Sequence, residues 1–141
     1  MGRLNPSRID KVNMRLVQAV LIIAIPLFAL LAEVGRDHGR DRWTSLDWLM
    51  SGLATWCIFE GFRFRRLWVF PSQRLLANDA GNSKALRRWK AGQLIVLAMA
   101  EAVAWYGLVV RMVLHGTLWQ ASVFYAVGLF LLLLWTPRRG F

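Results

Sequence analysis

The sequence contains few of the residues from which disulfide frameworks and metal centres are built. Its 141 residues include one cysteine, two histidines and eight acidic residues. The single cysteine, Cys57, excludes an intrachain disulfide framework and a CxxC metal site. Glycine-rich phosphate loops and the HExxH zinc motif are also missing from the printed sequence. The sequence therefore predicts no resident metal, no cofactor and no enzymatic activity.

Apolar residues, in contrast, are abundant, and the charge is strongly positive. Hydrophobic residues make up 57% of the chain and the formal net charge is +10, whereas an ordinary soluble domain is about 45–50% apolar. This combination indicates a membrane protein whose charges are confined to the connections between spans. Nucleic-acid binding would also explain a basic chain, but the arginines fall between hydrophobic runs and form no single face. We therefore expect no nucleic-acid partner.

Four apolar stretches are long enough, or nearly so, to cross a bilayer. A spanning helix needs about 20 residues, and none of the four shows the alternation of a strand. A cleaved signal peptide is the alternative for the first stretch, but Ala29-Leu-Leu-Ala32 is a poor cleavage site and three spans follow. We predict one membrane domain over residues 1–141, an all-α bundle of four transmembrane helices. The helices are expected at about 16–32, 46–62, 92–114 and 118–135.

The distribution of cations predicts the orientation in the membrane. Lysine and arginine are concentrated before the first span, between the second and third spans, and after the fourth. The positive-inside rule places these segments in the cytoplasm. An even number of spans also requires both termini to share a side. We therefore expect a multi-pass protein of the bacterial inner membrane with both ends inside.

The connection at residues 63–90 is the one sizeable segment outside the predicted spans. We interpret it as two short interfacial elements that lie on anionic lipid, joined by a turn within Ala77–Asn82. A loop that only sets the topology is the simpler alternative. The cations expected at this membrane surface are Arg63, Arg65, Arg66, Arg87, Arg88 and Lys90.

A single acid, Glu101, lies in the middle of the third span. An ionised carboxylate there costs roughly 2.5–3.5 kcal/mol on insertion scales. We therefore expect Glu101 to be protonated and to face another helix. By depth, Thr55 on the second span and Tyr125 on the fourth are the candidate hydrogen-bond partners, together with the Ile22 carbonyl. The acid is either an interhelical hydrogen-bond clamp or a site that exchanges a proton or cation, and the residues leave both open.

Small residues surround Glu101 on the third span, and charged residues flank its outer end. Alanines spaced four apart, with a glycine beyond them, favour close packing against another helix. Arg111 is expected to extend outward to the membrane surface. The outer connection at residues 33–47, which mixes acids and arginines with His38, is interpreted as a solvated loop and not as a metal site. The small residues are Ala98, Ala100, Ala102, Ala104 and Gly107.

Residues 100–110 read Ala-Glu-Ala-Val-Ala-Trp-Tyr-Gly-Leu-Val-Val. This stretch resembles the ion-carrying helix of the c subunit of rotary ATP synthases, the proteolipid family. The resemblance implies that Glu101 binds the coupling proton or Na⁺, whereas Tyr106 and Gly107 match only the flanking pattern. The repeated glycines of that family's other helix and its short Arg-Gln-Pro loop are not found here. As a whole, the chain resembles small four-helix bacterial membrane proteins of unassigned function.

The leading prediction is a non-enzymatic membrane protein that packs with itself or with a larger membrane complex through the small-residue face of the third span. The alternative is translocation of protons or Na⁺ through Glu101, in the manner of a c subunit. A lipid-modifying enzyme that uses Glu60 is a third reading. However, Glu60 is better explained by an ion pair with Arg63, three residues further along a helix.

Overall fold

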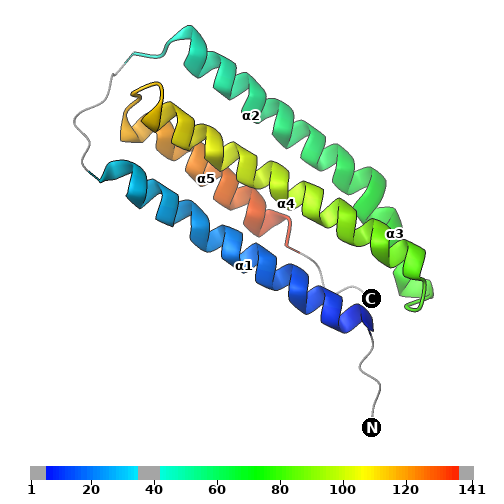
Figure 1. Cartoon of the computed structure of the whole chain (residues 1–141). Helices are drawn as coiled ribbons and strands as arrows, with labels where there is room; N and C mark the ends of the chain where they lie inside the picture. Colours follow the sequence, from blue (N-terminus) through cyan, green and yellow to red (C-terminus); the bar gives the residue numbers. More distant parts are fainter. Residues whose placement is uncertain (1–5, 35–41, 137–141) are drawn as a thin grey trace.

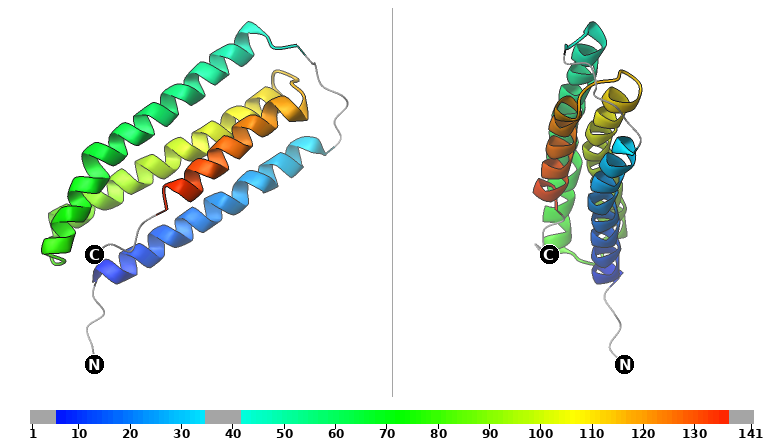
Figure 2. Two further views of the ribbon diagram at one scale, coloured as in Figure 1. Left: turned by 180° about the vertical axis from the view of Figure 1, so that it is seen from behind. Right: turned by 90° about the vertical axis from the view of Figure 1, so that its left-hand side faces the viewer.

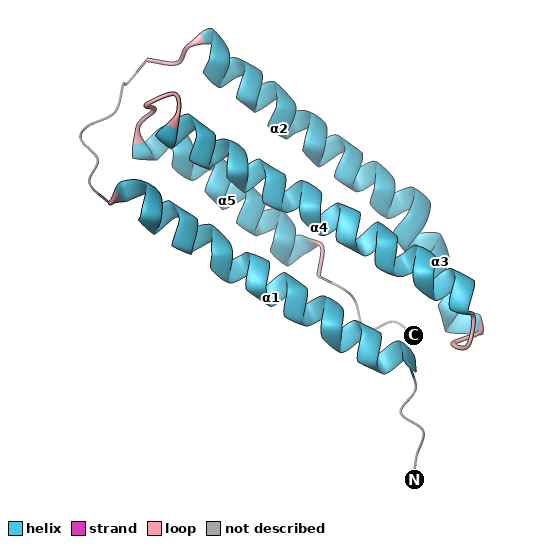
Figure 3. Cartoon of the chain, in the orientation of Figure 1, coloured by secondary structure: helices cyan, strands magenta, loops and turns pink. Residues whose placement is uncertain are grey.

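The computed structural model describes residues 6–34 and 42–136, and every regular element within them is a helix (Figure 3). A π-helical turn, Arg65–Val69, joins α2 to α3, so that the described chain forms four helical rods. The α-helices are α1 (Pro6–Glu33), α2 (Ser45–Phe64), α3 (Phe70–Asn78), α4 (Ser83–Met112) and α5 (Leu118–Leu134).

The 30-residue helix α4 is the centre of the bundle and packs against α1, α2, α3 and α5. In Figures 1 and 2, α1 and α2 lie on opposite sides of the pair formed by α4 and α5. The start of α1, the turn between α3 and α4, and the end of α5 all point toward one end of the bundle (Figure 1). We call this the basic end, because Arg63, Arg65, Arg66, Arg87 and Arg88 lie near it.

Two of the helices are long and apolar enough to cross a membrane, judged by length and composition alone. They are the Asn13–Glu33 part of α1 and the whole of α4. The helix α5 is apolar but has 17 residues, and α2 does not meet the same criterion. The predicted all-α class and the four helices are therefore confirmed, whereas the four membrane crossings stay a prediction.

The structure corrects the interpretation of residues 63–90 as two short surface elements. The chain continues as helix through the π-helical turn to Asn78, and α4 begins already at Ser83. Pro71 stands at the start of α3, where its missing N–H costs little. In the π-helical turn, Val69 is buried against Gly92 of α4, where an added Cβ would lie 3.2 Å from the Val69 side chain. Packing on α4 thus makes this segment a continuation of the long helices, where the sequence had suggested two separate surface elements.

The small residues of α4 are divided between two faces, which also differs from the prediction of one docking face. Ala100, Ala104 and Gly107 are buried, and α5 packs closely on them. A Cβ added to Gly107 would lie 2.9 Å from the carbonyl oxygen of Ala121, and one added to Gly128 would lie 3.0 Å from that of Ala100. These small residues are therefore used for packing within the chain.

At the basic end, α5 finishes inside the bundle, and side chains from other elements supply hydrogen-bond donors to its last carbonyls. Such carbonyls lack an intrahelical partner and are costly to leave unpaired in apolar surroundings. Gln18 of α1 donates to the carbonyl of Leu132, Arg65 to that of Leu134 at 3.2 Å, and Gln93 of α4 to that of Trp135 at 2.8 Å.

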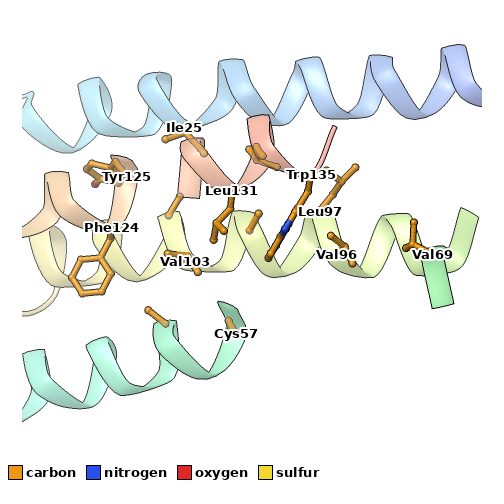
Figure 4. Packing of buried hydrophobic residues seen from close by; sticks show 14 of the residues in the cluster. Ile25, Cys57, Val69, Val96, Leu97, Val103, Phe124, Tyr125, Leu131 and Trp135 are labelled. Carbon is orange, nitrogen blue, oxygen red and sulfur yellow. The ribbon is translucent and has the colours of Figure 1, made fainter. Parts of the chain in front are cut away.

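The ring of Trp135 fills the space between these helices and is almost fully buried (Figure 4). Phe62 of α2 meets it edge to face, with ring centroids 5.2 Å apart. Gly61 lies directly beneath it, and a Cβ at this position would overlap the ring. Trp135 is therefore a core residue that joins α2 to the end of α5.

Candidate functional site

Glu101 lies on the wall of an open apolar groove between α1 and α4. Its side chain is buried, with the residue only 8% exposed, and it belongs to the lining of a cavity of about 400 Å³. The lining also contains Val17 and Leu21 of α1 and Ala98, Ala102, Trp105 and Tyr106 of α4. Glu101 therefore lies at this open groove between α1 and α4, and not between α4 and α5.

Neither side chain predicted to bond with Glu101 does so. The Oε2 atom of Glu101 is buried and has no hydrogen-bond partner among the described residues. Thr55 is exposed, and its hydroxyl donates to the Ser51 carbonyl at 2.9 Å, within α2. The Tyr125 hydroxyl is buried without a hydrogen bond to any described residue, Glu101 included. The expected clamp is therefore not formed within the described part of the chain.

Two aromatic side chains beside Glu101 are held by neighbouring helices. The Tyr106 hydroxyl lies 3.5 Å from the Cys57 sulfur atom of α2. The Trp105 ring packs on Phe28 of α1, with centroids 5.0 Å apart, and remains 47% exposed. One carboxyl group and two anchored aromatic rings therefore share a groove that is otherwise lined by aliphatic side chains.

At the end of α4 remote from the basic end, Arg111 forms a partly buried ion pair that no sequence pattern indicates. Its Nε and Nη2 atoms donate to the two carboxylate oxygens of Glu33 at 2.6 and 2.7 Å, and Nη1 donates to the Gly116 carbonyl at 2.8 Å. Arg111 is 5% exposed, so it does not extend outward to the surface as predicted. Bidentate pairs between an arginine and a carboxylate are strong and directional. This pair joins the end of α1 to the turn between α4 and α5.

The basic cluster predicted to lie on lipid is partly bonded to the chain itself. Arg63 pairs with Glu60 at 3.1 Å, which confirms the predicted helical ion pair. Arg65 caps α5 and lies 5.3 Å over the Phe70 ring, and Arg88 donates to the Leu67 carbonyl at 3.4 Å. Arg66 and Arg87 are exposed at the same end, and Lys90 is half-buried.

Next to this cluster, Arg66 and Arg74 line a second groove of about 820 Å³. Phe62 and Phe70 form its apolar side. Sequence reasoning did not include Arg74 among the surface cations, although its spacing from Arg66, eight residues along a helical segment, would have placed both on one face.

No group of three or more histidine, cysteine or acidic residues that could hold a metal ion occurs within residues 13–34 and 42–136, the part of the chain whose side chains the structure describes. His38, which the sequence analysis considered for such a site, lies outside the described residues.

The chain matches no family model, no curated protein and no solved structure. The similarity of residues 100–110 to the c-subunit helix therefore stays a prediction.

Proposed function

We propose that this chain is a small, non-enzymatic integral membrane protein that crosses the inner membrane four times with both ends in the cytoplasm. Large apolar side chains stay exposed along α1, α2 and α5, which supports contact with lipid, because soluble proteins rarely expose patches above a few hundred Å². These side chains include Leu16, Val20, Ile23, Leu27 and Leu30 on α1, Leu49, Trp56 and Phe59 on α2, and Phe130 and Leu133 on α5.

The proposed role of this membrane protein is proton exchange at Glu101. The observation that best supports this role is that a buried carboxyl oxygen of Glu101 has no hydrogen-bond partner among the described residues. Glu101 also lies in the lining of a groove that is open on one side. A carboxyl group used only as a clamp would be expected to have a partner in the bundle. We therefore rank proton exchange at Glu101 above the packing role, although the sequence alone favoured the packing role.

The same geometry favours a proton over Na⁺ at this site. Hard cations are held by several oxygen ligands. Glu101 is the one acid among the described residues that line the groove, and the Tyr106 hydroxyl beside it is engaged with Cys57.

Labelling with dicyclohexylcarbodiimide tests this role, because the reagent is lipid-soluble and reacts with protonated carboxyl groups. We expect labelling of Glu101, detected by peptide mass spectrometry, to fall as the pH rises and to be absent in Glu101→Gln. Glu60, paired with Arg63 at the basic end, is the internal control and should stay unlabelled. An unlabelled Glu101 in folded protein at low pH would exclude exchange at this position, and protection by Na⁺ would favour a sodium site.

A role in packing with itself or with a larger membrane complex is the second candidate. The supporting observation is that Ala98 and Ala102, which α5 does not cover, lie in the lining of the open α1–α4 groove. Small residues at this spacing allow another helix to approach closely. Native mass spectrometry in mild detergent tests it: Ala98→Phe should dissociate an assembly that Ala126→Phe, at an exposed position of α5, leaves intact. A wild-type monomer, or an assembly that survives Ala98→Phe, would reject this candidate.

A further inference from the structure

The α1–α4 groove combines the volume, the apolar walls and the single polar group of a ligand site. Its volume is about 400 Å³, against a usual range of about 300–1,000 Å³ for small-molecule sites. Its walls are almost entirely apolar, and Glu101 is the one charged or acidic side chain among the described residues of its lining. Such pockets, apolar with a single well-placed polar group, are typical of sites that recognise small ligands.

The aromatic residues of the groove narrow the chemistry of that ligand. Trp105 and Tyr106 follow Glu101 by four and five residues on α4, and all three belong to the groove lining. Faces of tryptophan and tyrosine rings attract organic cations within about 6 Å, an interaction that strengthens when water is excluded. Phe28 and Cys57 hold these two side chains from the neighbouring helices, so that the aromatic wall is preformed.

We propose that the α1–α4 groove binds a lipophilic organic cation, with Glu101 as its counter-ion and Trp105 and Tyr106 as its aromatic wall. This inference rests on the proposed proton exchange at Glu101. The cation enters as the carboxyl group releases its proton, so that one positive charge replaces another and no net charge is added to the apolar groove. The ligand must be apolar apart from its charge, because Val17, Leu21 and Leu97 form much of the remaining lining.

Among the groups that face the groove, Glu101 is the residue that we assign to coupling ligand binding with proton binding. Among the described residues, α1 contributes only apolar side chains to the groove lining, and α5 contributes none. From α4, the lining contains the hydroxyl of Tyr106, which meets Cys57 of α2. Arg111, the nearest described cation along α4 toward the opposite end, lies ten residues away and is paired with Glu33.

Binding of tetraphenylphosphonium to the purified full-length protein in detergent tests the proposal. We expect saturable binding by equilibrium dialysis that weakens at least tenfold in Glu101→Gln. Glu60→Gln is the matched control, with the same chemical change at an ion-paired acid outside the groove, and should bind like the wild type. Tetraphenylborate, which has the same shape and the opposite charge, should not bind saturably.

Two further measurements keep the test independent of folding defects. Trp105→Leu should weaken binding several-fold while the protein stays monodisperse and helical. Lowering the pH from 8.5 to 5.5 should weaken wild-type binding at least tenfold and leave the residual binding of Glu101→Gln unchanged. No saturable binding by the wild type, equal binding by Glu101→Gln, or equal binding of tetraphenylborate would overturn the proposal. If the carbodiimide still labels Glu101 in that case, only the ligand is wrong and proton exchange stands; if it does not, both fail.

Discussion

Glu101 and Arg111 are both buried ionisable residues of α4, yet the structure surrounds them very differently. Arg111 donates three hydrogen bonds, two to the Glu33 carboxylate and one to a backbone carbonyl. Glu101, ten residues earlier, has a carboxyl oxygen with no bond to any described residue and lies at an open groove. The comparison separates a side chain that joins helices from one that forms no hydrogen bond within the described bundle, as the proposed proton-exchange site requires.

The largest effect should follow from breaking the Arg111 pair. We expect Arg111→Met to lower the free energy of unfolding by about 3–5 kcal/mol, because Glu33 is left without its cation in a partly buried position. Denaturant unfolding in detergent, followed by circular dichroism, measures this change. The double variant Arg111→Met with Glu33→Gln should recover most of the loss, and an equally unstable double variant would show that the pair itself is not the cause.

Closing the space between α4 and α5 should have the next largest effect. Gly107→Leu places a side chain against the Ala121 carbonyl and Phe124, and we expect a loss of about 1–3 kcal/mol from overpacking. Gly52→Leu is the control, because no atom lies within 4 Å of a Cβ added there. Equal thermal stability of the two variants would contradict the close α4–α5 packing.

Removing a donor from the end of α5 tests the packing at the basic end. We expect Gln93→Leu to cost about 1–3 kcal/mol, since the Trp135 carbonyl then lacks its buried partner. Hydrogen exchange of the last turn of α5 should increase in the same variant. Unchanged exchange there would mean that this hydrogen bond does not hold the helix end.

The smallest change in stability is expected at Glu101 itself. Glu101→Leu removes a buried polar group that forms no hydrogen bond with the described residues, so unfolding should change by less than about 1 kcal/mol or shift toward higher stability. The same unfolding assay as for Arg111→Met places the two residues on one scale. A loss comparable to that of Arg111→Met would make Glu101 a structural residue and remove the contrast.

The sequence predicted the positions of residues along the helices better than it predicted which residues meet. The central position of Glu101, the helical pair of Glu60 with Arg63, and the four helices follow from spacing along the chain, and the structure has them. Depth does not determine how each helix is rotated about its axis. Thr55 therefore faces away from the bundle, although its position along α2 had suggested a bond to Glu101.

The remaining differences arise from contacts between segments distant in the sequence. Arg111 bonds Glu33 across 78 positions, and no local pattern marks such a pair. The predicted turn within Ala77–Asn82 is confirmed between α3 and α4. The continuation of α2 into α3 depends on burial of Val69 and Leu76 against other elements, which the local charge pattern does not indicate. The assignment of the small residues to two faces of α4 likewise required the position of α5.

The central claim is that Glu101 exchanges a proton while the buried Arg111 pair does not. pH-difference infrared spectroscopy of the protein in lipid nanodiscs tests it most directly, because a protonated carboxyl group in apolar surroundings gives its own carbonyl stretching band. We predict one such band that disappears as the pH rises, that is missing in Glu101→Gln, and that persists in Glu60→Gln. A spectrum without a pH-dependent carboxyl band, or one that Glu101→Gln leaves unchanged, would contradict the claim.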